Sequence, residues 1–344
     1  MGNVDNKKNV KNEKIEKNEK SKNNDNNKKF KSGFVTIVGR TNVGKSTILN
    51  ALLGEKVAAV VNKPETTRTA IKGIINRENS QIIFTDTPGI HKPKTKYGEA
   101  LNDTAYSYTL DGDIILFVID ATLDFSKGID KGNLLILEKI KEGNNDKNDK
   151  EEKNNKKVIL LINKIDLVKD KNEILNIIEL FNKEYDFCSV IPISSIGNFD
   201  KKYKEEILKE IENNLDYGPM YYDSEEYTDQ TLRELVQETV REKSLMFLKD
   251  EVPHGIYVEC TKMKKSKTRS NESIFNVDCT IYCIRDSHKG IIIGKNGLML
   301  KKIGSSSRIE LEKILRCKVN LKLTVKVDKN WQDNAKAFNK LLSK

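Results

Sequence analysis

The sequence contains no apolar run of about 18 residues or more, so no segment has the composition of a membrane-spanning helix. Its N-terminal residues lack the apolar stretch of a secretory signal and are too acidic for a transit peptide. Asn6 stands where N-myristoylation requires Ser or Thr. We therefore expect a cytoplasmic protein, with an organelle of bacterial origin as the alternative.

Cysteine and histidine are also scarce. The five cysteines form no CxxC pair and the three histidines are scattered, which argues against a zinc site. The cysteines are therefore expected to be reduced, mostly buried thiols, as is typical of a cytosol-like compartment.

Charge is distributed unevenly along the 344 residues, a length that fits two domains and that we expect to form a monomer. Residues 1–32 hold 10 Lys or Arg and 5 Asp or Glu, residues 33–228 hold 27 and 32, and residues 229–344 hold 24 and 14. The basic C-terminal third points to a polyanionic partner such as nucleic acid.

Three polar stretches interrupt the regular patterns. Residues 1–32, with 10 Lys and 9 Asn, predict a disordered tail. Residues 143–157 are typical of a surface insert, which adds little loop-closure entropy. Residues 262–273 form a third interruption, whose Lys262–Arg269 cluster is either an additional phosphate contact or a solvated loop.

Over residues 33–213, short β-branched apolar runs alternate with helical patterns. The expected strands are Phe34–Val38, Gln81–Thr85, Asp113–Ile119, Val158–Ile162 and Phe187–Ile191. The expected helices are Ser46–Leu53, Tyr97–Leu110, Asp130–Glu142, Glu173–Lys183 and Lys201–Asn213. This alternation predicts an α/β domain of three layers with a mostly parallel sheet.

The order of elements changes after a linker over residues 214–228, which predicts a separate α+β domain at 229–344. Its expected elements are a long helix from Thr228 to Leu248, strands Gly255–Glu259 and Phe275–Ile284, two short helices split at Gly294–Gly297, strand Val319–Val327 and a last helix from Trp331.

A phosphate-binding motif, G-x-x-x-x-G-K-S, follows the first expected strand and opens a helix. Its residues are Gly39, Arg40, Thr41, Asn42, Val43, Gly44, Lys45 and Ser46, with Thr47 next. The glycines let backbone N–H groups surround phosphates. Lys45 is expected to reach the β- and γ-phosphates and Ser46 to ligate Mg²⁺, so the first domain is predicted to be a P-loop NTPase.

A second motif, Asp86-Thr87-Pro88-Gly89, follows the strand that ends at Thr85. Asp86 is expected to hold Mg²⁺ and the Gly89 N–H to meet the γ-phosphate. Because the strands of a parallel sheet end at one edge, this motif and the phosphate loop are expected to share a crevice.

Two further motifs select guanine. In Asn163-Lys164-Ile165-Asp166, Asp166 is expected to accept two hydrogen bonds that guanine offers and adenine does not. The stem of Lys164 is expected to pack on the base, and Ser194 and Ser195 to donate to guanine O6.

The polar segment Lys63–Thr69 is typical of a switch loop. Thr67 is expected to ligate Mg²⁺ only while γ-phosphate is present, and Thr66 is the alternative. Ile90 stands where a glutamine would orient the attacking water, which predicts slow intrinsic hydrolysis. Catalysis would then rest on electrostatic stabilisation by Lys45, Mg²⁺ and backbone dipoles such as the Gly89 N–H.

In the C-terminal domain, the turn Gly294-Lys295-Asn296-Gly297 lies between two expected helices. Because glycine has no Cβ, a nucleic-acid backbone can approach it closely, and Lys295 would face phosphate. The basic residues around the turn are Arg285, Lys289, Lys301, Lys302 and Arg308. This order of elements, with its basic residues, predicts a domain that binds single-stranded RNA.

Together the motifs resemble those of the Era family of bacterial and organellar GTPases, in which a translation-factor-like G domain precedes a KH domain. The resemblance covers residues 33–344. It is most specific at Gly39–Ser46, Lys63–Arg68, Asp86–His91, Asn163–Asp166 and Arg285–Gly297. Thr41 and Ser195 depart from the proline and alanine that the family usually has there.

The resemblance implies GTP hydrolysis coupled to binding near the 3′ end of small-subunit ribosomal RNA during 30S assembly. It further implies that Ile90 is the family's hydrophobic replacement of glutamine, and that Asn42 helps to seat K⁺ and thereby assists catalysis. Peripheral membrane association is known in the family, although this sequence shows no basic amphipathic anchor. Two alternatives are an RNA-binding scaffold with negligible GTP turnover and a GTPase that acts on tRNA or the large subunit.

Overall fold

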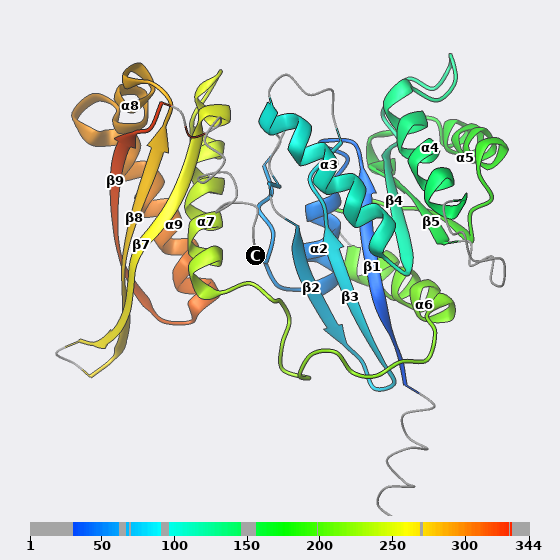
Figure 1. Ribbon diagram of the computed structural model, residues 1–344, viewed down its shortest axis with the longest axis horizontal. Helices are drawn as coiled ribbons and strands as arrows, with labels where there is room; N and C mark the ends of the chain where they lie inside the picture. The colour runs from blue at the N-terminus through cyan, green and yellow to red at the C-terminus, as the bar shows by residue number, and fades with distance from the viewer. Residues whose placement is uncertain are drawn as a thin grey trace, which may run out of the picture.

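Figure 1 shows the computed structural model of the protein. It describes residues 30–61, 67–68, 70–90, 96–145, 156–197, 199–268, 271–329 and 331. The expected tail lies outside the described residues as far as residue 29, whereas Lys31 and Ser32 belong to the first strand, so the fold begins earlier than expected. The expectation for the insert falls mostly on residues 146–155, also outside this range. Among the described helices, none is both long and apolar enough to cross a membrane.

The first unit is built on a six-stranded sheet of order β2-β3-β1-β4-β5-β6, parallel except for the β2–β3 pair. The strands are β1 (Lys31–Gly39), β2 (Ile71–Asn76), β3 (Ser80–Asp86), β4 (Ile114–Asp120), β5 (Lys157–Asn163) and β6 (Ser189–Pro192). The parallel strands are almost continuously apolar because helices bury both faces. The antiparallel edge strand β2 was not among the expected strands.

Two helical layers complete the predicted three-layer arrangement (Figure 1). On one face, α2 (Lys45–Leu53) and α6 (Glu205–Asn214) contribute apolar side chains such as Leu49 and Ile211 to the core. On the other face, α3 (Lys96–Asp111), α4 (Lys131–Asn145) and α5 (Lys171–Glu184) contribute side chains such as Ala105, Ile140 and Phe181. The short helices η1 (Ile165–Leu167) and η2 (Asp200–Lys204) lie in the connections.

The second unit is a three-stranded sheet of order β7-β8-β9 covered by helices on one face. Its elements are α7 (Leu232–Phe247), η3 (Val252–Gly255), β7 (Ile256–Lys267), β8 (Ser273–Cys283), α8 (Asp286–Ile293), η4 (Lys295–Gly297), α9 (Leu298–Leu315) and β9 (Lys318–Val327). The helix α7 begins later than expected because Thr231 and Glu234 form a capping box there. The second helix after the glycine turn is long rather than short, and only Trp331 of the expected last helix is described.

The expectation of a polar interruption at residues 262–273 is wrong. The strands β7 and β8 pair from Ile256 opposite Cys283 to Lys267 opposite Ser273, with a bulge after Cys260. The outer part of this hairpin extends beyond the helices (Figure 1), so Lys262, Lys264, Lys265 and Lys267 are exposed there and the sequence carries little apolar alternation.

The linker between the two units follows the sheet edge because the buried Gln81 side chain holds it. Its Oε1 accepts from the amides of Tyr221 and Tyr222 at 2.7 and 3.0 Å, and its Nε2 donates to the Tyr222 carbonyl at 2.8 Å. Thr228 then pairs with Gly73 of β2. A side chain of the G domain thus fixes the path toward the second unit.

Replacing Gln81 with alanine should lower the free energy of unfolding by about 1–3 kcal/mol, because the amides of Tyr221 and Tyr222 lose their acceptor. Urea unfolding followed by circular dichroism would measure the loss, and limited proteolysis would report opening of the linker. A change below about 0.5 kcal/mol, the usual range for surface substitutions, would contradict this role.

Candidate nucleotide and RNA sites

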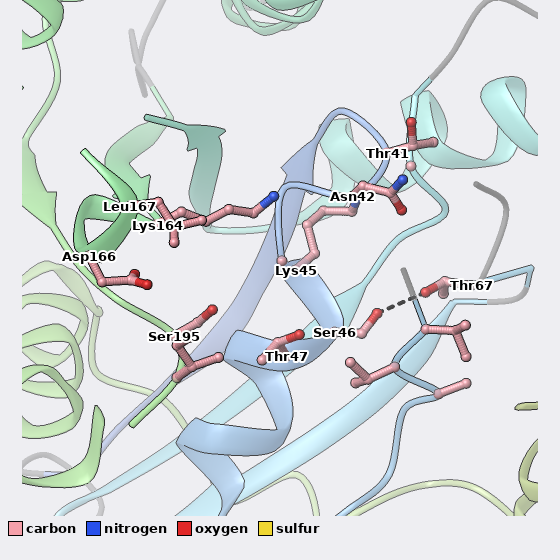
Figure 2. Close-up of a pocket in the computed structure, with 16 residues that line it drawn as sticks. Thr41, Asn42, Lys45, Ser46, Thr47, Thr67, Lys164, Asp166, Leu167 and Ser195 are labelled. Atoms are coloured by element: carbon pink, nitrogen blue, oxygen red, sulfur yellow. Dashed lines mark hydrogen bonds between the residues drawn. The ribbon is translucent and has the colours of Figure 1, made fainter. Parts of the chain in front are cut away.

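A cavity of about 320 Å³ lies at the carboxyl edge of the parallel strands. The predicted residues that line it are Thr41, Asn42, Gly44, Lys45, Ser46, Thr47, Thr67, Gly89, Lys164, Asp166 and Ser195. Figure 2 shows Lys164, Asp166 and Ser195 at one end and Thr67 at the other, with Lys45 and Ser46 between them. Segments more than 100 residues apart in the sequence therefore form one elongated pocket.

Two glycines of the pocket allow the backbone to pack closely. Gly44 has a φ of 104°, and a Cβ there would lie 2.3 Å from the Asn163 side-chain nitrogen. A Cβ at Gly89 would lie 2.8 Å from Thr41 and 3.1 Å from the Lys45 ammonium. Larger residues at these positions would displace the groups that form the phosphate end of the pocket.

The Lys45 ammonium is buried beside the phosphate loop. It donates to the carbonyls of Gly39 and Arg40 at 3.1 and 3.0 Å. Burial lowers the pKa of Lys45 to about 8, although the neighbouring Asp86 carboxylate opposes the shift. A phosphate in the pocket would add negative charge beside the ammonium and favour its protonated form.

Three oxygen-bearing side chains meet beside Lys45. The Asp86 Oδ2 accepts from the Ser46 hydroxyl at 2.6 Å and from the Thr67 hydroxyl at 3.3 Å, and the two hydroxyl oxygens lie 2.9 Å apart (Figure 2). The buried Asp86 Oδ1 has no hydrogen-bond partner among the described residues. Hydroxyl and carboxylate oxygens with spare acceptor capacity suit Mg²⁺. Burial raises the pKa of Asp86, while Lys45 and the two hydroxyls oppose this shift.

The structure thus brings Thr67 to the position expected of the switch residue, whereas Thr66 lies outside the described residues. The register of the sheet explains why Asp86 lies beside Ser46. Ile37 of β1, just before the phosphate loop, stands opposite Asp86 of β3. Sequence spacing alone did not show which of Thr66 and Thr67 would be the switch residue.

The base end of the pocket is formed by the loops after β5 and β6. Asp166 and Ser195 line it, and the Lys164 ammonium lies 2.6 Å from the Asp120 carboxylate. Asp120 was not predicted as a site residue. It ends β4 directly opposite Asn163. Asp120 therefore also lies at the carboxyl edge of the parallel strands, where the other motifs were expected to meet.

Asn163 does not line the pocket but holds the loops around it together. Its side-chain nitrogen donates to the Val43 carbonyl at 2.8 Å and to the Ser195 hydroxyl at 3.1 Å, and its oxygen accepts from the Ser195 amide at 3.0 Å. One side chain thereby ties the phosphate loop to both loops at the base end.

Several other predicted residues do not line the cavity. Arg40 pairs with Asp130, whose carboxylate is 2.8 Å away and was also missed from the sequence. The Ile90 side chain is only 4% exposed and packs in the core, so it does not occupy the place of a water-orienting glutamine. The remaining predicted residues outside the lining are Gly39, Val43, Asp86, Thr87, Pro88 and Ser194.

The second predicted site lies on the helical side of the smaller sheet. Gly294 and Gly297 both have positive φ, 71° and 75°. A Cβ at Gly294 would lie 2.7 Å from the Met299 side chain, whereas one at Gly297 would meet open space. Lys295 and Asn296 are exposed on the turn between them.

Basic and apolar side chains surround this turn. Arg285, Lys301 and Lys302 are exposed, Lys289 is half-buried, and the Lys302 ammonium lies 4.4 Å from the Phe247 ring centroid. The apolar side chains of Ile291 and Leu298 are 50% and 63% exposed beside the turn. Apolar surface beside lysines is suited to stacking bases while phosphates are neutralised.

A guanine-nucleotide pocket on a P-loop sheet, followed by a KH unit, defines a GTPase with an RNA-binding domain. A family model described as 50S ribosome-binding GTPase matches residues 34–164, and a KH domain model matches residues 251–332. GTPase Era of Clostridioides difficile is 44% identical over 304 residues, covering 88% of this chain and 95% of the relative. GTPase Era of Caldanaerobacter subterraneus is 46% identical over 313 residues, covering 91% and 97%.

Solved structures that are similar to this chain belong to the same family as these relatives. A crystal structure of Era in complex with MgGDPNP and nucleotides 1506–1542 of 16S ribosomal RNA is 36% identical, with a TM-score of 0.79, covering 91% of this chain and 99% of the other. A point variant of Aquifex aeolicus Era bound to GDP·AlF4⁻ gives a TM-score of 0.78 at the same identity and coverage. The chain belongs to the GTPase Era family, as the motifs predicted.

The affinity for GDP should fall about fivefold between pH 7 and pH 8.7, as follows from a Lys45 pKa near 8 in the nucleotide-free protein. Below pH 8 the Lys45 side chain is mostly a charged ammonium that can pair with phosphate. Above pH 8 it is mostly neutral, so the Lys45 amine must take up a proton when GDP binds. Titration calorimetry across this range would measure the change. Lys45→Arg keeps its charge and should show no such slope; an equal slope in that variant would contradict the assignment.

Asp166→Asn should reduce the affinity for guanine nucleotides by up to about 10⁴-fold and favour xanthine nucleotides, because an amide cannot accept both guanine N–H groups. Competition between GDP and XDP for a fluorescent nucleotide would report the switch. Retained guanine preference would show that Asp166 does not read the base.

Proposed function

We propose that this protein is a GTP-hydrolysing switch that binds 16S-type ribosomal RNA near its 3′ end and acts in assembly of the 30S subunit. The observation that carries the proposal is the union of a guanine-nucleotide pocket and an exposed, lysine-flanked Gly294–Gly297 turn in one chain. The RNA fragment bound to the structurally similar Era supports the choice of RNA. We further propose that the protein is monomeric and cytoplasmic.

Within the pocket we assign Lys45 to the β- and γ-phosphates, and Ser46, Thr67 and Asp86 to Mg²⁺. Bridging of phosphate oxygens and neutralisation of their charge is the chemistry that Mg²⁺ supplies when bound. The Gly89 N–H would meet the γ-phosphate. With the Ile90 side chain buried, no side chain at this position orients water, so intrinsic hydrolysis should be slow.

We also assign Asn42 to a K⁺ ion beside the phosphates. Asn42 lines the pocket and has a φ of 63°, a conformation that asparagine tolerates better than most residues. A higher rate of phosphate release in K⁺ than in Na⁺ would support this assignment.

A GTPase acting on the large subunit is the second candidate, favoured by the description of the family model as 50S ribosome-binding. That model matches residues 34–164, within the G domain, and no part of the KH domain. The KH domain would contact the RNA, and the structurally similar Era that holds an RNA fragment holds one of 16S ribosomal RNA, so we favour the small subunit. Crosslinking the intact protein to total ribosomal RNA through its KH domain decides between the two candidates. The crosslinked RNA fragments should come from the small subunit if our proposal is right and from the large subunit if the second candidate is right.

Gly297→Asp should weaken binding of a small-subunit 3′ RNA fragment by at least about tenfold, because a carboxylate would face the phosphates. A Cβ at position 297 meets open space but the residue keeps a positive φ of 75°, which aspartate tolerates better than most residues, so a modest loss of stability is expected while GDP affinity should remain near wild type. Filter binding at several salt concentrations measures the loss.

Lys295→Ala is a milder variant for the same test. It should reduce the slope of the logarithm of the RNA-binding constant against the logarithm of the salt concentration by about 0.7, as expected for one lost phosphate contact. Unchanged RNA affinity in both variants would show that the turn does not bind RNA, whereas a parallel loss of GDP affinity would indicate misfolding.

A further inference from the structure

The residue after Thr67 is held by the other domain. The Arg68 side chain leaves the G domain, and its Nη1 donates to the Ile256 carbonyl at the start of β7, at 2.6 Å. Its guanidinium carbon lies 5.4 Å from the Trp331 ring centroid. Arg68 is 7% exposed and Trp331 is fully buried, so this contact is shielded from water.

The receiving site for Arg68 is itself rigid. Trp331 donates its indole N–H to the Gly255 carbonyl at 3.2 Å and packs against Tyr257 with ring centroids 5.1 Å apart. Tyr257 in turn stacks on Tyr282 of β8 at 4.5 Å. A charge-assisted hydrogen bond to a fixed carbonyl, together with a desolvated cation–π contact, gives the guanidinium a defined position.

Consecutive Cα atoms are about 3.8 Å apart, so the position of Arg68 restricts that of Thr67. Thr67 points the other way, into the group formed with Ser46 and Asp86. We propose that Arg68 is a positioning residue of the GTPase centre, which uses the KH domain as an anchor to keep the Thr67 hydroxyl beside the metal ligands. This depends on the role proposed above for Thr67.

The anchor also adjoins the proposed RNA site. A Cβ at Gly255 would lie 2.9 Å from the Ile284 side chain and 3.4 Å from Nδ1 of His288. His288 belongs to α8, the helix that ends at the Gly294 turn. The segment that receives Arg68 therefore packs against the helix that would carry RNA, which gives the KH domain a direct physical connection to Thr67.

The test measures single-turnover GTP hydrolysis, KM and GDP affinity in the full chain. Arg68→Ala should lower kcat between about fivefold and 150-fold, the range of typical coupling energies. GDP affinity should stay within about twofold, because Thr67 acts only with γ-phosphate present. Arg68→Lys, which keeps a cation beside Trp331, should recover part of kcat.

Lys56→Ala is the matched control. Lys56 also joins the domains, through Glu242 at 2.8 Å and Glu310 at 3.1 Å, but it is not adjacent to a predicted metal ligand. It should leave kcat within about twofold of wild type. An equal loss of kcat in Lys56→Ala would overturn the proposal, because any loosening of the domains would then suffice.

Thr67→Ala separates this inference from the function on which it depends. If Arg68 acts through Thr67, the double variant should be no slower than Thr67→Ala alone. Additive losses, or wild-type kcat in Arg68→Ala, would overturn the positioning role. If Thr67→Ala itself keeps wild-type kcat, the assignment of Thr67 to Mg²⁺ is wrong, whatever Arg68 does.

Discussion

The hydrogen bond of 2.6 Å between the Ser46 hydroxyl and the Asp86 carboxylate joins the start of α2 to the end of β3, and the nucleotide pocket depends on this contact. It forms only because β1 and β3 run parallel with Ile37 opposite Asp86. A slip of one residue would turn Asp86 to the other face of the sheet and would force the apolar side chains buried on both faces of β1 and β3 to repack. The packing of the core therefore fixes the relative positions of the proposed metal ligands Ser46 and Asp86, and Thr67 joins them from outside the sheet.

The two helices that follow the proposed phosphate-binding turns begin in the same way. Both α2 and α9 begin after a glycine with positive φ, Gly44 and Gly297, and neither has a side-chain cap. By contrast, Asp170 caps α5 and Thr231 caps α7, away from the predicted ligands. Because the first N–H groups of a helix need acceptors, uncapped ends are available to phosphate oxygens. The same physical solution thus serves a nucleotide in one domain and is suited to an RNA backbone in the other.

The sequence predicted the class of both domains and most of the residues around the pocket, because the motifs follow apolar strands whose ends must meet at one edge. It did not predict β2, whose pairing is supported by the linker through Thr228, about 150 residues away. Both strands of the β7–β8 hairpin were expected, over Gly255–Glu259 and Phe275–Ile284, but the outer part of the hairpin was missed for a related reason. Its outer half has no helix to cover it, so Lys262 and Lys267 follow no apolar alternation that would indicate a strand.

The roles of Asn163 and Arg68 were not predictable from spacing either. Asn163 belongs to a base-recognition motif, yet its contacts bind three loops together, a function visible only when all three are placed. Arg68 could not be distinguished from an ordinary switch-loop residue, since its acceptor at Ile256 lies in the other domain.

Paired charges cross the interface that contains Arg68. Lys56 contacts Glu242 and Glu310 across the domains, while Lys243 on α7 lies 3.3 Å from Glu242. Such pairs regain hydration when they separate, so their net contribution to holding the domains together is small. Apolar surface, in contrast, would oppose separation in proportion to its area. These ion pairs by themselves therefore oppose separation only weakly, which would allow the position of Arg68 to respond to what the KH domain binds.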